Sequence, residues 1–495
     1  MASTSRLNPV SAKDAEFFAN AGIAMTHAGE GKLEARYNDD LFGKYSGDSQ
    51  LVLFPKSTSE VSKILAYCNQ QRVAVVTQGG NSGVAGGAIG HKGEVILSMR
   101  DMNRVRDIDE ITGVLVAESG CVLDDLDLHV QKYGYIMPVD LGARKKCMLG
   151  GNVSTSAGGL RYLRYGSMHG NVLGLEVVLP NGEVLDALFT LKKDASGYDI
   201  KQLFIGAEGT LGVVTAVAIS LAPRPLSSQI AVLGLRDFAQ IQRAFVLARQ
   251  SLGEIVSAFE FWERRCNEIV VEYEKYSSPI GTGHEFYVML ETRGSSARHD
   301  AEKMDQFLKT LRKEGVIEES GVFTSAEDRE AAWLFRSQMA NAHNKSGCMY
   351  VYDFSLPAKH QHNLLLATRN HLTELGLYKD AGNNDAPVRD CTIFGHIGDN
   401  NIHLQVIARE FGGEVEAAVE PWIYEWVGSH SGSVAAEHGL GAHKGKFLKY
   451  SKSPAVIGAM KSLKTLFDPV GIMNPGKNVS GAESQTREKR TLGNL

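Results

Sequence analysis

The first part of the chain alternates short buried strands with polar turns and one clear amphipathic helix. Runs rich in β-branched residues predict strands at Leu51–Phe54, Val73–Thr77 and Val95–Ser98. Between the first two, apolar residues recur at helical spacing over Ser59–Gln70. The resulting strand–helix–strand unit predicts a sheet covered by helices. Further strands are predicted at Val114–Glu118, Leu173–Leu179, Val184–Asp186 and Gly212–Leu221.

The pattern changes near Ala222-Pro223-Arg224-Pro225, where prolines bracket a predicted linker. Beyond this linker, strands alternate with long charged helices, which predicts a second domain of the α+β or α/β class. Its predicted strands are Ile230–Leu235, Glu285–Glu291, Met349–Ser355, Thr392–Phe394 and Ile402–Val406. Predicted helices lie at Asp300–Glu314, Asn363–Leu375 and, near the end of the chain, Pro454–Leu466.

Length, charge and cysteine spacing exclude several classes of protein. A chain of 495 residues predicts more than one domain, because single cores stop growing at roughly 250–300 residues. The net charge of -5 and a pI of about 6.3 argue against nucleic acid as a partner. No two of the six cysteines have CxxC spacing, so reduced cysteines are expected. No apolar run is long enough for a membrane span.

A glycine-rich loop, Gln78-Gly79-Gly80-Asn81-Ser82-Gly83, follows one of the predicted strands. A loop that binds a pyrophosphate must bring several backbone N–H groups close to its oxygens, and glycines permit that approach. The loop is not GxGxxG and the chain has no GxxxxGK[ST] motif, which disfavours a Rossmann NAD site and a P-loop. One such loop alone is more often a turn. However, residues 150–159 and 206–212 form two more.

The order of these loops resembles the FAD domain of the vanillyl-alcohol oxidase and p-cresol methylhydroxylase superfamily. Residues Met137–Ala143, Gly158–Ser167 and Tyr198–Gly206 look like the D-2-hydroxyglutarate dehydrogenase and D-lactate dehydrogenase branch. The resemblance implies an α+β fold with a two-part FAD-binding PCMH-type domain, an α/β substrate (cap) domain and a C-terminal helical return to the FAD site. The segments expected are 1–45 (N-terminal), 46–225 (FAD-binding), 226–450 (substrate and metal), 451–480 (helical return) and 481–495 (loose tail).

The resemblance also implies where FAD lies, with its pyrophosphate on the loop at 78–83. Some relatives tether the flavin to a histidine in that loop, whereas this chain has Asn81 there, so we expect non-covalent FAD. The cofactor-binding residues expected are Gln78, Gly79, Gly80, Asn81, Ser82, Gly83, Pro138, Asp140, Gly150, Gly151, Ser156, Gly159, Gly166, Gly209, Val214 and Asn474.

A second informative region is the stretch from Phe394 to Leu404, with sequence FGHIGDNNIHL. Two apolar runs flank a Gly/Asp/Asn turn, which predicts a hairpin. If His396 and His403 close the turn, they lie opposite each other with Cβ atoms roughly 5 Å apart, close enough to share one metal. Two histidines near a turn are more often exposed or satisfied in a core than ligands, so the hairpin alone leaves both interpretations open.

The family resemblance favours the metal. GHxGDxNxH followed by Glu437-His438-Gly439 resembles the family's metal site, in which His396, His403 and Glu437 match the ligands and His438 matches the catalytic base. Two nitrogens and one oxygen suit Zn²⁺, with Mn²⁺ or Co²⁺ as alternatives. A metal on the substrate oxygens would lower the pKa of the hydroxyl, an imidazole would accept its proton, and hydride would pass to flavin N5.

The substrate is less firmly indicated than the reaction. Arg336 aligns with an arginine that the family uses on a substrate carboxylate, for which its forked donors suit it. Without the family, an arginine on a solvated helix face would be an equal interpretation. Ala340 and Val351 stand where hydroxyglutarate enzymes have Thr and Lys, Gln405 replaces Asn, and Asn400 replaces Gly. D-2-hydroxyglutarate is the first candidate, and D-lactate or a longer apolar D-2-hydroxy acid stays open.

Two rival functions are also compatible with the sequence: a flavin oxidase that passes electrons to O₂, and a non-catalytic interaction protein on the same fold. For the dehydrogenase, the electron acceptor could be electron-transfer flavoprotein, a quinone, cytochrome c or a keto acid. A homodimer and a mitochondrial location are expected by resemblance only. The N-terminus has no apolar core of a signal peptide and little of a transit peptide, so a cytoplasmic location is the alternative.

Overall fold

The computed structural model describes residues 7–29, 31, 33–379 and 385–479, which form two compact units. The first unit consists of Met1–Gly159, Gly166–Arg224 and Glu437–Leu495, and the second of Leu160–Tyr165 and Pro225–Ala436. The chain therefore returns to the first unit at Glu437, whereas the segments expected from the sequence were divided after residue 450. The expected tail at 481–495 lies outside the described residues.

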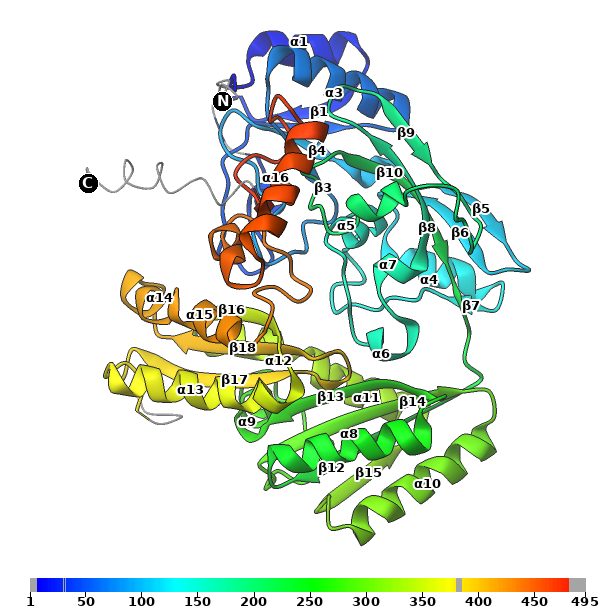
Figure 1. Ribbon diagram of the computed structural model, residues 1–495, viewed down its shortest axis with the longest axis vertical. Coiled ribbons are helices and arrows are strands. Elements are labelled where there is room, and N and C mark those ends of the chain that lie inside the picture. Colours follow the sequence, from blue (N-terminus) through cyan, green and yellow to red (C-terminus); the bar gives the residue numbers. More distant parts are fainter. Residues whose placement is uncertain (1–6, 30, 32, 380–384, 480–495) are drawn as a thin grey trace. The chain divides into compact units, whose positions relative to one another are not determined.

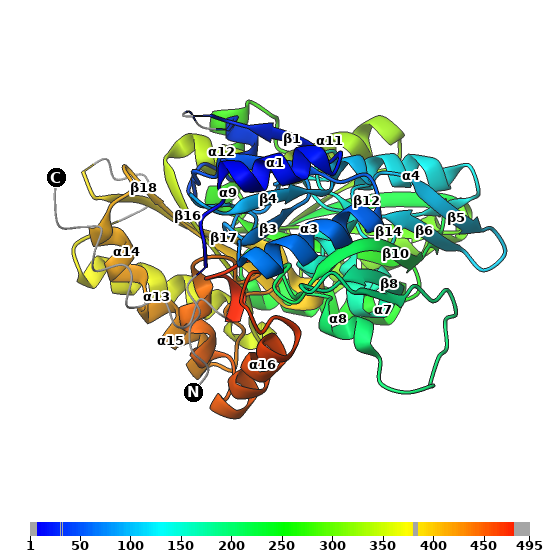
Figure 2. The ribbon, with the colours of Figure 1, turned by 90° about the horizontal axis from the view of Figure 1, so that it is seen from above.

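The first unit begins with a four-stranded sheet in the order β1-β2-β4-β3. Its strands are β1 (Ala24–His27), β2 (Leu51–Phe54), β3 (Val75–Gln78) and β4 (Val95–Ser98), and β4 pairs in parallel with both β2 and β3. Helix α3 (Thr58–Gln71) connects β2 to β3 and buries the apolar stripe predicted for it. It begins at Ser57, whose side chain accepts a hydrogen bond from the Glu60 N–H. Figure 2 shows α3 and α1 (Ala12–Asn20) beside these strands.

A second sheet of the first unit has the order β5-β6-β10-β8-β9 and is antiparallel throughout. Its strands are β5 (Val105–Asp109), β6 (Val114–Glu118), β8 (Val172–Val178), β9 (Val184–Ala187) and β10 (Val213–Ser220). The short pair β7 (Tyr135–Ile136) and β11 (Ala222–Pro223) and the helices α2 (Ala35–Asn38), α4 (Leu123–Gln131), α5 (Leu149–Ser154), α7 (Met168–Asn171) and α16 (Pro454–Phe467) complete the unit.

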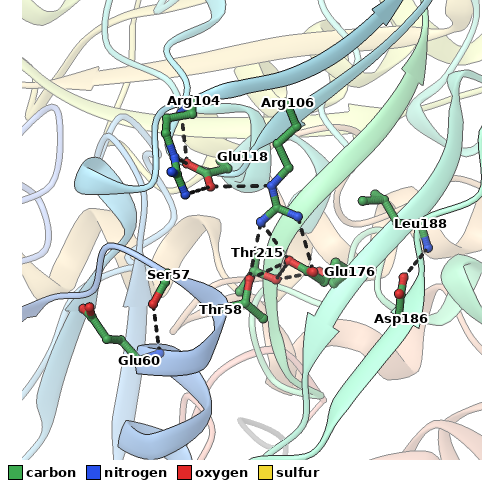
Figure 3. A network of polar contacts seen from close by, with 10 residues as sticks. All are labelled: Ser57, Thr58, Glu60, Arg104, Arg106, Glu118, Glu176, Asp186, Leu188 and Thr215. Atoms are coloured by element: carbon green, nitrogen blue, oxygen red, sulfur yellow. Dashed lines mark hydrogen bonds and ion pairs between the residues drawn. The ribbon is translucent and has the colours of Figure 1, made fainter.

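Ion pairs and hydrogen bonds connect the second sheet to helix α3. The carboxylate of Glu118 is fully buried and lies 2.9 Å from Arg104 and 3.5 Å from Arg106. Arg106 also pairs with Glu176 at 3.0 Å, and Glu176 accepts a hydrogen bond from Thr58 in the first turn of α3 (Figure 3). Because Glu118 is paired with two arginines, and Glu176 with Arg106 and the hydroxyl groups of Thr58 and Thr215, the burial of both carboxylates is compensated.

The second unit is built on one seven-stranded sheet in the order β15-β12-β14-β13-β17-β18-β16. All of its neighbouring strands pair in the antiparallel sense. The strands are β12 (Ser227–Leu235), β13 (Val256–Glu263), β14 (Phe286–Gly294), β15 (Glu319–Phe323), β16 (Cys348–Ser355), β17 (Val388–His396) and β18 (Asn401–Ala408).

Helices cover both faces of this sheet. Residues of α9 (Arg264–Glu274), α11 (Ala326–Ser337) and α12 (Met339–Ser346) form one core cluster with β12, β13, β14, β17 and β18. Figure 1 shows α8 (Phe238–Leu252), α10 (Ala297–Lys313) and α13 (Gln361–Glu374) running along the sheet in the foreground. The remaining helices are α6 (Tyr162–Tyr165), α14 (Gly413–Val419) and α15 (Trp422–Ser429). No helix in the described part of the chain is long and apolar enough to cross a membrane.

Candidate active site

The three glycine loops of the first unit come together. The Cα of Gly151, in the second loop, lies 3.8 Å from where a Cβ on Gly79 would sit. The third loop joins the second through hydrogen bonds from the Gly206 N–H to the Val153 carbonyl and from the Glu208 N–H to the Ser154 carbonyl. Residues that are distant in sequence therefore line one region, as a dinucleotide site requires.

The glycines of these loops fall into two groups. At Gly80, Gly150 and Gly159 a Cβ would lie within 2.4 Å of Lys146, Ser119 and Asp140 atoms respectively, so packing of the chain itself excludes a side chain. At Gly83 and Gly151, in contrast, a Cβ would meet nothing within 4 Å, and neither has a positive φ. Neither strain nor contact within the protein requires glycine at these two positions, and open backbone here fits close approach by a cofactor.

Three of the expected cofactor residues use their side chains on the protein backbone. Gln78 donates to the carbonyls of Tyr37 and Ala88, and Asn81 donates to those of Arg36 and Asp39. Asn474, only 1 % exposed, donates to the Gly87 and Glu208 carbonyls at 2.9 and 2.7 Å. These amides hold the loops in place. Pro138 and Asp140 lie before α5, Ser156 after it, Gly166 after α6, Gly209 in the third loop and Val214 in β10.

Glu208, which the sequence analysis did not single out, anchors the segment that follows His438. Its buried carboxylate accepts hydrogen bonds from the N–H groups of Leu440 and Gly441 at 2.9 and 2.8 Å and from the side chain of Asn478 at 2.8 Å. Burial raises the pKa of Glu208, and these donors oppose the rise. Within the same unit, Glu437 accepts a hydrogen bond from the Gly159 N–H at 2.9 Å, and its carboxylate lies 3.9 Å from His438 Nε2.

In the second unit, the predicted hairpin is confirmed as β17 and β18, but the expected direct opposition of the two histidines is wrong. His396 pairs with Asn401, and His403 pairs with Phe394. The turn takes up residues 397–400, with a 3-10 turn at Ile397–Asp399 and Asn400 at a φ of 66°. His396 and His403 are therefore diagonal neighbours on one face of the sheet.

Their imidazoles nevertheless meet. The Nε2 atoms of His396 and His403 lie 3.2 Å apart, and both side chains are buried. Two nitrogens bound to one tetrahedral cation at Zn–N distances of about 2.0–2.1 Å would be separated by about 3.3 Å. The diagonal arrangement thus gives the spacing that a shared metal needs.

Each histidine has a carboxylate at its other nitrogen. Glu260 of β13 lies 2.8 Å from His396 Nδ1, and Asp353 of β16 lies 3.6 Å from His403 Nδ1. Both acids are almost fully buried. The hydrogen bond between Glu260 and His396 Nδ1 favours the tautomer that leaves Nε2 of His396 free to bind a metal, and it fixes the direction of that ring.

Arg336, expected to bind a substrate carboxylate, lies in the same cluster. Its Nη2 donates to Glu260 Oε2 at 2.7 Å, and its guanidinium carbon lies 4.8 Å from the centre of the Phe394 ring. Only 5 % of the residue is exposed, so the alternative of a solvated helix face is wrong. Its Nε has no hydrogen-bond partner among the described residues. Glu260 thus orients both Arg336 and His396.

The candidate side chains therefore form two sets, one in each unit. The first contains the glycine loops together with Glu437 and His438, and the second contains Arg336, His396 and His403. The Ala436 N–H, directly before Glu437 in the chain, donates to Asp353 Oδ2 at 3.0 Å. Asp353, which lies beside His403, therefore also accepts a hydrogen bond from the residue that precedes Glu437.

Two family profiles match most of the chain. A profile of the FAD binding domain matches residues 49–188, and a profile of the C-terminal domain of FAD linked oxidases matches residues 224–478. The chain belongs to the FAD-linked oxidase family. Members of this family bind FAD through the first of these domains, so this protein is an FAD-dependent oxidoreductase.

Several relatives within the FAD-linked oxidase family are similar over most of the chain. The D-2-hydroxyglutarate–pyruvate transhydrogenase of Saccharomyces cerevisiae is 45% identical over 446 residues, which are 90% of this chain and 89% of the yeast protein. A mitochondrial D-2-hydroxyglutarate dehydrogenase of Arabidopsis thaliana is 43% identical, covering 89% and 77%. A putative mitochondrial D-lactate dehydrogenase of Schizosaccharomyces pombe is 43% identical, covering 90% and 84%. The predicted family branch is confirmed.

Solved structures confirm the fold class. p-Cresol methylhydroxylase with substrate bound superposes with a TM-score of 0.72 at 14% identity, covering 95% of this chain and 98% of that chain. The 4-ethylphenol oxidase of Gulosibacter chungangensis gives a TM-score of 0.69 at 18% identity with the same coverage. At such low identity the likeness concerns the fold alone.

Proposed function

We propose that this FAD-dependent enzyme oxidises a D-2-hydroxy acid to the 2-keto acid, with D-2-hydroxyglutarate as the first candidate and D-lactate as the alternative. The observation that carries the proposal is the buried cluster of Arg336, His396, His403 and Glu260. It combines a carboxylate-binding cation with two imidazoles whose Nε2 atoms lie 3.2 Å apart. The names of the yeast, plant and fission-yeast relatives point to the same substrates.

We propose that His396, His403 and Glu437 hold a divalent metal, Zn²⁺ first and Mn²⁺ or Co²⁺ as alternatives. The buried nitrogen pair with carboxylates behind it fits such an ion. When bound, the metal supplies Lewis-acid chemistry that makes the substrate hydroxyl easier to deprotonate. His438 accepts that proton, and Arg336 holds the C1 carboxylate through its forked donors.

We propose that the glycine loops hold FAD without a covalent bond, because Asn81 offers no nucleophilic nitrogen. FAD supplies an acceptor for the C2 hydride. Gly83 and Gly151 provide open backbone for the pyrophosphate, Gly79 lies beside Gly151, and Gln78 and Asn474 hold the loops around it. The remaining proposed contacts are Gly80, Ser82, Pro138, Asp140, Gly150, Ser156, Gly159, Gly166, Gly209 and Val214.

Further proposals about partners and location depend on the relatives. The candidate electron acceptors are electron-transfer flavoprotein, a quinone, cytochrome c and a keto acid. The keto acid is supported by the name of the yeast relative, a D-2-hydroxyglutarate–pyruvate transhydrogenase. A mitochondrial location follows the names of the plant and fission-yeast relatives. A homodimer stays a proposal from the resemblance.

The reductive half-reaction tests the function directly. We expect the flavin of the purified holoenzyme to be bleached without oxygen by D-2-hydroxyglutarate or D-lactate, and not by L-lactate, with D-malate as a third D-acid. Treatment with EDTA should slow bleaching, because the metal assists deprotonation. Stopped-flow absorbance measures the rate. Equal rates with and without chelator would remove the metal from the reaction, and bleaching by no D-acid would refute the substrate class.

The substrate preference is expected to respond to Val351. This residue pairs with Gln405 across β16 and β18, two positions along β18 from His403. Val351→Lys supplies an ammonium for a second carboxylate, and a charged hydrogen bond contributes about 1.5–3 kcal/mol. We expect kcat/KM for D-2-hydroxyglutarate to rise about tenfold or more relative to D-lactate. Val351→Met, of similar length without charge, is the control, and an equal change in both variants would contradict the prediction.

A further inference from the structure

The segment Leu160–Tyr165 connects two residues of the first unit, Gly159 and Gly166, yet it packs within the second unit. Both glycines have a positive φ, of 88° and 76°. At Gly159 a Cβ would also lie 2.3 Å from the Asp140 carbonyl oxygen. Both ends of this segment therefore have a backbone conformation that favours glycine.

Arg161 is the buried anchor of the segment. Its guanidinium binds the carboxylate of Glu291 on β14 through two contacts, of 2.7 and 3.1 Å, and its side chain is 8 % exposed. Glu291 also accepts hydrogen bonds from Ser257 at 2.7 Å, Arg293 at 3.1 Å and the Trp333 indole at 3.0 Å. These cations and donors outweigh burial and lower the pKa of Glu291 to about 2. The carboxylate is thus charged and fully engaged.

This anchor touches the helix that carries Arg336. The Arg161 guanidinium lies 5.0 Å from the centre of the Trp333 ring, while the indole N–H binds the same carboxylate as Arg161. Trp333 precedes Arg336 by three residues on α11, so the two side chains lie on neighbouring turns of one face. A shift of the α11 backbone at Trp333 would also move the backbone at Arg336.

A second contact touches the turn that carries His396. A Cβ on Gly398 would lie 3.1–3.2 Å from three carbons of Leu163, so the Leu163 side chain is packed against the backbone of the turn. Gly398 follows His396 by two residues, within the turn that sets the diagonal placement of the two histidines. Residues 160–165 thus contact both the helix that carries Arg336 and the turn that follows His396.

We propose that residues 160–165 position the active site: Arg161, through Glu291 and Trp333, sets helix α11, and Leu163 sets the turn after His396. The inference rests on the proposed function for its kinetic consequence. Gly159 and Gly166, at either end of the segment, are proposed FAD contacts.

Arg161→Met and Leu163→Ala test the proposal, with Arg164→Met as the matched control, because the contacts of Arg164 with the described residues are with the Glu254 carbonyl and the Tyr165 ring. We expect flavin and metal content to stay near wild type while flavin reduction by the D-acid slows about 10–100-fold in Arg161→Met and about tenfold in Leu163→Ala. Arg161→Lys should recover part of the rate. Hydrogen exchange of peptides spanning His396 to His403 should quicken in the first two variants and not in the control.

Wild-type exchange in this hairpin together with flavin reduction within twofold of wild type, in a folded Arg161→Met or Leu163→Ala enzyme, would overturn the inference. If Arg161→Met loses its flavin or unfolds, Leu163→Ala decides alone, because it leaves the buried ion pair in place. A wild-type enzyme whose flavin no D-acid reduces would refute the proposed function instead. In that case the exchange measurement still decides whether the segment positions the hairpin.

Discussion

Replacing His403 by alanine is expected to lower the rate of flavin reduction by the D-acid about a thousandfold or more, without loss of FAD. The physical reason is that the proposed metal would contribute several kcal/mol to stabilising negative charge on the substrate hydroxyl oxygen, and about 4 kcal/mol corresponds to a thousandfold. His403 provides one of the two buried Nε2 atoms that lie 3.2 Å apart, and His396 provides the other. A single remaining imidazole cannot hold the ion in the same geometry.

Metal analysis and stopped-flow absorbance measure the two consequences together. The variant should contain less than about a tenth of the wild-type metal per flavin, because it would lose one of the three proposed ligands. His430→Ala, at the end of α15 where His430 stacks on Trp426, removes an imidazole from the same unit and should retain both metal and rate. Undiminished flavin reduction in His403→Ala would remove the metal site from the mechanism.

The sequence predicted the elements of the fold well where the local pattern is decisive. Strands β2 and β4 begin and end at the predicted residues, and the helix predicted at Pro454–Leu466 is one residue longer. Strand β13 was not predicted. Every residue from Val256 to Glu263 is buried, since helices cover both faces of the sheet, so the run lacks the alternation that marks a half-exposed strand.

Glu260 lies in this buried strand, β13, and was not predicted as a site residue from the sequence. A single acidic residue between Phe259 and Phe261 gives no motif, and its importance depends on contacts with Arg336 and His396, which are 76 and 136 residues away. Asp353, in strand β16, was missed for the same reason, whereas Glu208 lies in the third glycine loop and was missed because its contacts with Leu440 and Gly441 are 232 and 233 residues away. The one available signal is that a glutamate in an apolar strand needs a partner, because a buried charge without one is very costly.

The histidine pair shows the opposite limit. The two histidines were predicted correctly to be neighbours in a hairpin. The pairing register of the two strands could not be predicted, because it depends on the number of residues in the turn. Asn400, where the family pattern has Gly, adopts a left-handed conformation with a φ of 66°. Asparagine tolerates this region better than most residues, so the departure from the family pattern preserves the turn.

The last prediction concerns His438. His438→Ala is expected to slow flavin reduction about 10²–10⁴-fold, the usual contribution of a positioned general base. FAD and metal content should stay at wild-type levels, because the residue is proposed as a ligand of neither. Glu208 still holds the following backbone through the N–H groups of Leu440 and Gly441, so truncating the imidazole should leave the loop in place.

Chemical rescue distinguishes a base from a structural residue. Added imidazole should restore part of the flavin-reduction rate of His438→Ala in proportion to its concentration, since a small base can enter the space left by the ring and accept the hydroxyl proton. It should not accelerate His403→Ala, whose defect is the missing ion. His443→Ala, five residues along the same segment, is the control for loss of an imidazole. Flavin reduction within threefold of wild type in His438→Ala would assign the proton to another group, and the buried cluster of the second unit would then have to supply it.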